Sequence, residues 1–415
     1  MASFLLTLSP GLCYDTFVES FINLPVLRPA EQEGNMDKSV LGVGIIGCGT
    51  FCGAYLSTLG SVFKNCRVVA CSDIDLERAH AVAKEWNIPH PGTTEELLAD
   101  PAVDMCVIVT GPNSHYPLIL QCLRAGKHVY CEKPMAITLE QADEIVALAE
   151  EKGLHVTVAP DTILDARVQT IRKALDDGLI GTPLNVTLNF VGPGADFWHP
   201  QPDFLYKPGG GPIMDMGPYY LTVAVSLLGP IEQIFCYASR GFDTREIHGH
   251  DCAVEVDTDY TAVLRFRSGV IGSFNVSFDG VRTRAPGMEI YGTKGVLLCP
   301  DPNTLAGELQ LLERDKLRAA VEASSAEPFE RVDYLYSDES FSLCETIEPA
   351  FPQLDAHRGM GPSDMAACVL EGTQPRCSMY LARHITEVLL GFDICLRTGL
   401  PYTLRTTCER PDPIK

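Results

Sequence analysis

An acid, a base and a proline stand together at Glu132, Lys133 and Pro134, directly after a short apolar run, residues 128–131. A lysine ammonium carries three hydrogen-bond donors, and without perturbation it titrates at about pH 10. Beside a substrate hydroxyl, such a side chain can orient the group and share its proton. A polar turn whose proline ends the strand is the simpler interpretation, so the rest of the chain must decide between them.

A glycine-rich turn supplies a second chemical signal. Gly47 and Gly49 follow the first apolar run: Gly47 allows a tight turn, and Gly49 lets the backbone approach a pyrophosphate at the start of the next helix. Cys52 stands where Gly or Ala is usual, but it is still small. Asp73 ends the next apolar run, where an acid accepts hydrogen bonds from a ribose diol and repels a 2′-phosphate. The pattern favours NAD over NADP; a structural turn and an ordinary aspartate are the alternative.

The elements that must position these residues alternate regularly. We expect strands within 39–49, 66–73, 102–111 and 127–131, and helices at 75–86, 115–126 and 138–153. In the last helix apolar residues recur at helical spacing, with Thr138 as N-cap and Gly153 as the stop. Such alternation is typical of a doubly wound parallel sheet of the α/β class.

Length and charge narrow the class of protein. With 415 residues the chain should form two domains. Its net charge of −22 opposes binding to nucleic acids and to anionic membranes. No apolar run reaches the roughly 18 residues that span a bilayer. Residues 1–35 read as an N-terminal extension that is a poor signal peptide, and we assign them no chemistry.

The sixteen cysteines favour a cytoplasmic protein, because they are scattered through apolar segments as reduced, buried thiols would be. Metal binding is not expected. Cys48 and Cys52 have no second pair at ligand spacing, and the stretch 248–252 has no second cluster near it in sequence.

Six motifs in order resemble the glucose-fructose oxidoreductase / inositol dehydrogenase / MocA oxidoreductases, over residues of about 40–403. They lie at 110–129, 125–136, 178–184, 209–229, 290–299 and 380–401. The resemblance implies an NAD(P)-binding Rossmann domain, 36–160, and a second, α+β domain, 161–415. The second domain should hold a large, open, mostly antiparallel sheet whose outer face commonly makes a homo-oligomer contact. Independently, residues 184–191, 259–267 and 270–278 alternate with the period of such strands.

The resemblance also implies a catalytic set. Lys133 matches a lysine that contacts both the nicotinamide and the reacting hydroxyl, and Pro134 a proline that is often cis. Asp215 matches the family's aspartate. Tyr219 stands where many members carry histidine, although some carry tyrosine. The oxidised nicotinamide would disfavour a protonated Lys133 and Asp215 would favour it, so we expect Lys133 to orient the hydroxyl and share the proton, Tyr219 to be the acid/base, and Asp215 to tune both.

Binding residues follow from the same placement. The expected cofactor contacts are Gly47, Gly49, Thr50, Phe51, Asp73, Thr110, Asn113, His115, Glu132 and Lys133. The expected substrate contacts are Lys133, Trp198, His199, Asp215 and Tyr219. The aromatic and polar loop 197–212, with Asp203, Tyr206 and Lys207, suits a carbohydrate, but it could also be a surface loop. His115 could instead be a helix-start residue. Asp161 and Thr162 are weaker candidates for the cleft, and His384 is expected to serve packing.

The function expected is hydride transfer between nicotinamide and a secondary alcohol of a sugar, glycoside or cyclitol, catalysed by a dehydrogenase or reductase. Two alternatives stay open: an NAD-dependent enzyme that cleaves glycosides through transient oxidation, and a dinucleotide-binding sugar sensor without turnover. The acidic, low-pattern stretch 312–362 either shapes the cleft or covers the surface.

Overall fold

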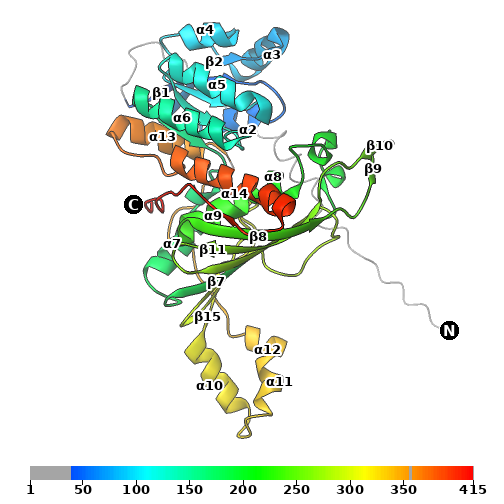
Figure 1. Ribbon diagram of the computed structural model, residues 1–415. Helices are drawn as coiled ribbons and strands as arrows, with labels where there is room; N and C mark the ends of the chain where they lie inside the picture. Colours follow the sequence, from blue (N-terminus) through cyan, green and yellow to red (C-terminus); the bar gives the residue numbers. More distant parts are fainter. Residues whose placement is uncertain (1–38, 355–357, 415) are drawn as a thin grey trace, which may run out of the picture.

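The computed structural model describes residues 39–354 and 358–414, so the N-terminal extension predicted at 1–35 lies outside the described residues. These residues build two large sheets, one above the other in Figure 1, and a separate two-stranded sheet. The first is a parallel sheet in the order β3-β2-β1-β4-β5-β6. Its strands are β1 (Leu41–Ile46), β2 (Cys66–Ser72), β3 (His90–Gly92), β4 (Met105–Ile108), β5 (His128–Cys131) and β6 (Val156–Val158). The predicted doubly wound parallel sheet is confirmed.

Helices cover both faces of this sheet, which is why all six residues of β1 are buried. They are α2 (Cys52–Leu56), α3 (Leu76–Trp86), α4 (Thr94–Ala99), α5 (Pro112–Arg124) and α6 (Leu139–Lys152). Helix α6 begins and ends as its sequence predicts. The Thr138 hydroxyl accepts from the Gln141 N–H, and Gly153 ends the helix with a φ of 64°.

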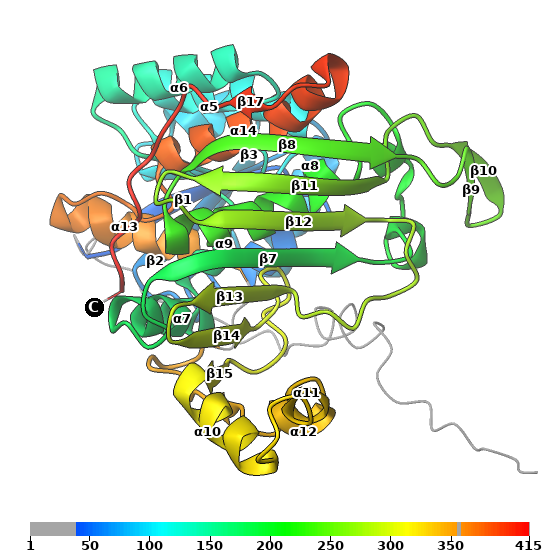
Figure 2. The same cartoon turned by 60° about the horizontal axis from the view of Figure 1, so that its bottom comes forward.

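The second sheet is mixed and mostly antiparallel, in the order β16-β15-β14-β13-β7-β12-β11-β8-β17 (Figure 2). Its strands are β7 (Pro183–Val191), β8 (Ile231–Ser239), β11 (Asp259–Phe266), β12 (Ile271–Ser277), β13 (Met288–Gly292), β14 (Gly295–Cys299), β15 (Gln310–Glu313), β16 (Glu345–Thr346) and β17 (Tyr402–Thr403). Only the β7–β12 pair in it is parallel among the described strands. Exposed and buried residues alternate without exception along β11, because one face is solvated and the other packed.

The packed face lies under two helices that separate the sheets (Figure 1). Every residue of α9 (Gly217–Leu228) is buried. Helix α14 (Met379–Thr398) contacts β8 of the second sheet and α6 of the first. His384 on α14 serves packing, as predicted: it is fully buried, it accepts from the Ile231 N–H, and burial lowers its pKa to about 4.

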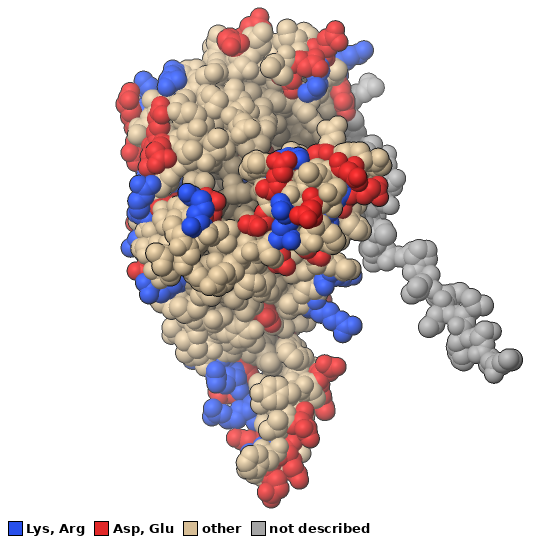
Figure 3. Space-filling model, turned by 45° about the vertical axis from the view of Figure 1, so that its right-hand side comes forward, with Lys and Arg blue, Asp and Glu red and all other residues tan. Residues whose placement is uncertain are grey.

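Short elements join or decorate this frame. Four stand between the sheets or beside them: η1 (Thr162–Leu164), α7 (Ala166–Asp176), α8 (Pro212–Asp215) and α13 (Met360–Glu371). A loop with η2 (Ala195–Phe197) and η3 (Asp203–Tyr206) packs under a hairpin of β9 (Thr244–Ile247) and β10 (His250–Ala253). An arm of α10 (Arg314–Ser324), α11 (Arg331–Leu335) and α12 (Asp338–Phe341) projects from the sheet edge at β15, with acidic and basic side chains on its surface (Figures 1 and 3).

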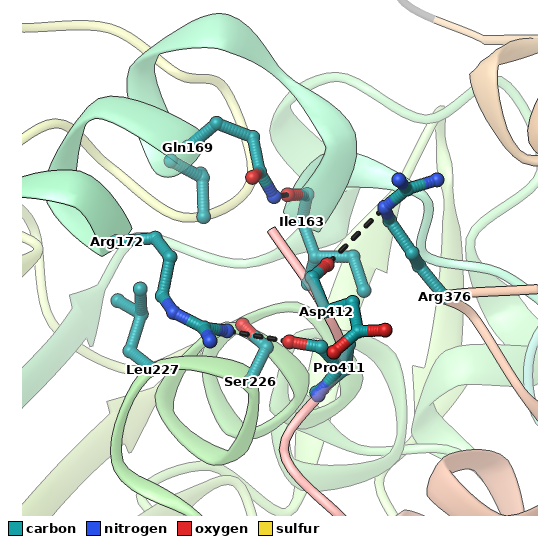
Figure 4. Close-up of a pocket in the computed structure, with 9 residues that line it drawn as sticks. Ile163, Gln169, Arg172, Ser226, Leu227, Arg376, Pro411 and Asp412 are labelled. Atoms are coloured by element: carbon teal, nitrogen blue, oxygen red, sulfur yellow. Dashed lines mark hydrogen bonds between the residues drawn. The ribbon is translucent and has the colours of Figure 1, made fainter. Parts of the chain in front are cut away.

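The last residues form a strap across the back of the second domain. Arg172 of α7 donates to the Pro411 carbonyl at 2.5 Å, and Arg376 donates to the Asp412 carbonyl at 3.2 Å; both line the small cavity drawn in Figure 4. The Ile414 N–H donates to the Gln169 Oε1 atom at 2.9 Å. The tail therefore joins α7 to the segment that leads into α14.

Among the described helices none is long and apolar enough to cross a membrane. All cysteines in the described part of the chain have free thiols.

Candidate active site

Lys133 and Asp215 meet between the two sheets. Lys133 follows β5 at the carboxyl edge of the parallel sheet, and Asp215 is the last residue of α8. The Lys133 Nζ donates to the Asp215 Oδ1 at 2.7 Å and to the Asp215 carbonyl at 3.0 Å. Their side chains are 17% and 16% exposed, so a small ligand could still reach the pair. The Lys133–Pro134 peptide bond is cis, as the resemblance implied.

Tyr219 completes a group of three in the first turn of α9. The Lys133 Nζ lies 5.5 Å from the centre of the Tyr219 ring, and Tyr219 is 8% exposed. The chain thus brings together the lysine, the aspartate and the tyrosine that the sequence singled out.

The charge of Lys133 is stabilised by these neighbours. Burial alone would lower the pKa of the ammonium, but Asp215 and, after it, Tyr219 outweigh burial and raise that pKa above its ordinary value. Lys133 is therefore a hydrogen-bond donor at neutral pH.

Arg358, which the sequence did not indicate as a site residue, also reaches Tyr219. Its Nη2 donates to the Tyr219 Oη at 3.1 Å. Its Cζ lies 5.8 Å from the Tyr219 ring centre and 5.9 Å from that of Phe51 in the glycine turn. Arg358 lies in the low-pattern stretch 312–362, where no periodicity or motif distinguishes it from its neighbours.

Glu132, Asp161 and Tyr55 lie close enough to Arg358 to act on its charge. The Tyr55 hydroxyl donates to the Glu132 Oε1 at 2.6 Å and lies 3.4 Å from the Tyr130 hydroxyl. Asp161 is fully buried and accepts from the Gly361 N–H at 2.9 Å. Burial raises the pKa of Asp161, and the positive charge of Arg358 opposes that rise. The Glu132 carboxylate thus already accepts a hydrogen bond from Tyr55 within the protein. Its direct contact with the cofactor stays a prediction.

The glycine turn fits a dinucleotide. Gly47 has a φ of 102°, and a Cβ there would lie 2.7 Å from the Val109 carbonyl oxygen, so only glycine suits the position. A Cβ on Gly49 would meet nothing within 4 Å, which leaves its backbone open to a phosphate. Helix α2 has only five residues, so the N–H groups of the turn rather than a long helix dipole would carry this contact.

Asp73 is part of the same turn. Its Oδ2 accepts from the Cys48 N–H at 2.8 Å and its Oδ1 from the Asp75 N–H at 2.9 Å. The carboxylate therefore fixes the turn against β2 at the position expected for a ribose-binding acid. Thr50 and Phe51 are exposed at the turn, where the cofactor was predicted to touch them.

Two of the predicted cofactor contacts, Asn113 and His115, follow β4, and they differ in exposure. Asn113 is exposed near the start of α5 and remains a candidate for direct contact. His115 is fully buried, with its ring nitrogens 2.7 Å from the Pro134 carbonyl and 2.9 Å from the Thr110 carbonyl. His115 thus ties the loop after β4 to the peptide that follows Lys133, and it presents no surface to a ligand.

The loop 195–212 is also divided. Trp198 is 47% exposed, and its ring lies 5.3 Å from that of His199. Burial lowers the pKa of His199, and the charge of Asp215 opposes the shift. By contrast, Asp203 is within hydrogen-bond distance of His250, Lys207 forms an ion pair with Glu255, and the Tyr206 hydroxyl donates to Asp196. These contacts tie the three side chains to neighbouring segments, and their contact with a carbohydrate stays a prediction.

The remaining candidates contribute no further site. Thr162 is buried in η1 beside Asp161. Within residues 39–354 and 358–414 no group of three His, Cys, Asp or Glu side chains could hold a metal ion.

Comparisons with known proteins agree with this geometry. Residues 41–159 match the model of an oxidoreductase family with an NAD-binding Rossmann fold, and residues 168–298 match the GFO/IDH/MocA C-terminal domain. The trans-1,2-dihydrobenzene-1,2-diol dehydrogenase of Bos taurus is 32% identical over 57% of this chain and 67% of its own. The 1,5-anhydro-D-fructose reductase of Ensifer adhaerens is 31% identical over 61% of this chain and 74% of its own.

Solved structures share the fold. An oxidoreductase from Agrobacterium radiobacter, solved with NAD+, L-tartaric acid and magnesium, superposes with a TM-score of 0.70 at 18% identity, over 88% of this chain and 98% of that one. The glycine turn, the two sheets and the matched domains lead to one conclusion: the chain belongs to the GFO/IDH/MocA family of NAD-binding oxidoreductases.

Proposed function

We propose that the protein transfers hydride between NAD and a secondary alcohol on the ring of a sugar, glycoside or cyclitol. The observation that supports this most is the contact of Lys133 with Asp215, beside Tyr219, at the sheet edge that carries the glycine turn. Bound NAD supplies the hydride acceptor. The protein's own part is to orient the alcohol and to move its hydroxyl proton.

Each side chain then has a distinct role. The Lys133 ammonium donates to the substrate oxygen and holds it in place, because Asp215 keeps it charged and directed. Tyr219 exchanges the proton with that oxygen. Of the remaining predicted cofactor contacts, we propose that Gly47, Gly49, Thr50, Phe51, Asp73, Thr110 and Asn113 act directly, while Glu132 and His115 hold the elements around them.

The substrate class is supported by two observations. The relatives named above act, by their names, on a cyclic diol and on an anhydro-sugar. The exposed Trp198 ring and the neighbouring His199 offer an apolar face and a polar group, which suit a ring with hydroxyls.

A substrate screen tests the proposal. Sugars, glycosides, cyclitols and cyclic diols are incubated with NAD or NADP, and keto-sugars with the reduced forms, while the absorbance of the reduced cofactor is followed. We expect turnover with at least one ring alcohol, and faster with NAD. Cleaved glycoside without net reduced cofactor would support the glycosidase instead. Tight dinucleotide binding without turnover of any compound would support the sensor.

We further propose that the chain divides into domains at 36–160 and 161–415, and that the second pairs with a copy of itself through the outer face of its sheet. Tyr237, Val263 and Ile271 are exposed on adjacent strands there, 74%, 53% and 40%. Light scattering should give the mass of an oligomer, and Val263→Glu should reduce it; a monomeric wild-type protein would refute this.

The free, buried thiols support a cytoplasmic location, which imaging of the tagged protein would test.

A further inference from the structure

Two cations face the side chain that we assign as acid/base. The Lys133 Nζ and the Arg358 Cζ lie 5.5 and 5.8 Å from the Tyr219 ring centre, and Arg358 donates a hydrogen bond to the phenol oxygen. Lys133 is committed to Asp215 by two hydrogen bonds. The proposed catalytic roles leave Arg358 without a function.

The hydrogen-bond chemistry of its guanidinium suggests a function for Arg358. Arginine has five N–H donors and no acceptor, whereas a phenol has one O–H donor and two acceptor lone pairs. When Arg358 donates to the Tyr219 Oη, the tyrosine's own proton cannot point back at the arginine. The hydroxyl must therefore donate in another direction, which leaves it free to serve an oxygen in the cleft.

The surroundings hold Arg358 in its charged form. Burial alone would lower the pKa of the guanidinium, but Tyr219, Glu132, Tyr55 and Asp161 outweigh it and raise that pKa. With two acids close by, Arg358 is poorly suited to bind an anionic substrate group, because its charge is already balanced. A neutral or anionic phenol oxygen fits better, and a charged donor stabilises a phenolate more than a phenol.

The backbone around Arg358 is built to bring it close. Gly359 has a φ of 100°, and a Cβ there would lie 2.5 Å from the Thr58 hydroxyl oxygen. A Cβ on Gly361 would lie 2.4 Å from the Tyr130 ring. Both glycines let this segment pass against the first domain, and the Gly361 N–H bonds Asp161.

We propose that Arg358 is a positioning residue that fixes the hydrogen-bond direction of the Tyr219 hydroxyl and stabilises its phenolate, so that tyrosine serves where many relatives carry histidine. In alcohol oxidation the substrate gives hydride to NAD and its hydroxyl proton to the Tyr219 phenolate oxygen. In the reverse direction the carbonyl carbon takes the hydride back from the reduced cofactor, and the carbonyl oxygen takes the proton from the Tyr219 hydroxyl. This inference rests on the function proposed above and adds how its acid/base is controlled.

A double-mutant cycle tests the proposal, with the substrate found in the screen. Arg358→Gln should lower kcat about 10- to 100-fold, as the loss of one charged hydrogen bond would, while the Kd for NAD changes less than about 3-fold. In a Tyr219→Phe background the same substitution should lower kcat by less than about 3-fold, because the hydroxyl on which it acts is gone. Arg358→Lys should retain more activity than Arg358→Gln.

Two further measurements separate positioning from folding. Added guanidinium ion should partly restore Arg358→Ala but not Arg358→Ala/Tyr219→Phe. Arg383→Gln, which removes another partly buried arginine that pairs with Asp143, is the matched control and should keep the wild-type kcat.

The outcomes are distinct. Equal kcat losses from Arg358→Gln with and without the Tyr219 hydroxyl would overturn this inference and leave the proposed function standing, as would a full-activity Arg358→Gln. A wild-type protein without any nicotinamide turnover would overturn both.

Discussion

Lys133 and Arg358 are both cations beside Tyr219, but they come from very different parts of the chain. Lys133 stands directly after a buried strand, where its neighbours in sequence already indicate a ligand edge. Arg358 is carried by a segment between β16 and α13 without periodic pattern. The comparison shows that a residue inside a sequence motif can be found from sequence, whereas one in a segment without motif or period cannot.

Within the stretch 312–362, too, two parts of the chain differ in their surroundings. In its first part, every residue of α10 and α11 is at least partly exposed, and Phe329 and Tyr336 are 91% and 82% exposed. Near its end, Arg358 lies against Tyr219. One acidic stretch therefore covers the surface in its first part and reaches Tyr219 near its end, and its role in shaping a cleft stays a prediction.

Removing Lys133 is the most direct test of the difference between the two cations. Lys133→Ala should lower kcat by about 10³-fold or more, a larger loss than that expected from Arg358→Gln, because Lys133 would touch the substrate itself. The Kd for NAD should change little. Stopped-flow turnover and a fluorescence titration of the cofactor would measure both, and normal turnover would refute the role of Lys133.

Asp215→Asn should weaken the lysine without removing it. We expect kcat to fall about 10- to 100-fold, because one charged partner of the ammonium is lost. Asp215 is the principal group that raises the pKa of Lys133, so its removal should lower that pKa. The alkaline limb of kcat/KM should then move to lower pH than in the wild type, and an unmoved limb would show that Lys133 does not control it.

The glycine turn offers a test of the cofactor site with a control from the same turn. Gly49→Val should raise the Kd for NAD about 10-fold or more, because the new side chain would fill the open space in front of the backbone. Gly53→Ala should change that Kd little, since its Cβ would lie 3.9 Å from the Trp86 ring, in ordinary contact. Equal effects of the two substitutions on the Kd for NAD would contradict the proposal that the cofactor approaches the backbone at Gly49.

Deleting the arm should have the smallest effect. Strands β15 and β16 are antiparallel neighbours, with Leu311 opposite Glu345, so a short Gly-Ser turn can replace residues 315–343. We expect kcat and KM within about 2-fold of the wild type. A large loss of activity would show that the arm acts on the cleft at a distance and would remove the distinction between the two parts of the stretch.

The first sheet was largely predictable because its strands are continuous apolar runs that end in glycine or acid. Lys133, Asp215 and Tyr219 were found through motifs, and the structure brings them together. The short β3 was missed, since three residues give no period. His115 shows that a sequence position does not reveal burial. The residue lies beside the loop after β4, as predicted, but its ring is buried and both ring nitrogens contact backbone carbonyls.

The contacts of α14 and of the terminal strap bear on how the protein forms during synthesis. The parallel sheet is complete at Val158, so it can fold while the remainder is still being translated. Arg358, α14 and the strap are synthesised later, and α14 is the helix that packs on both sheets. A nascent chain would therefore hold a folded nucleotide-binding sheet before Arg358 can reach Tyr219 and before α14 can join the two sheets.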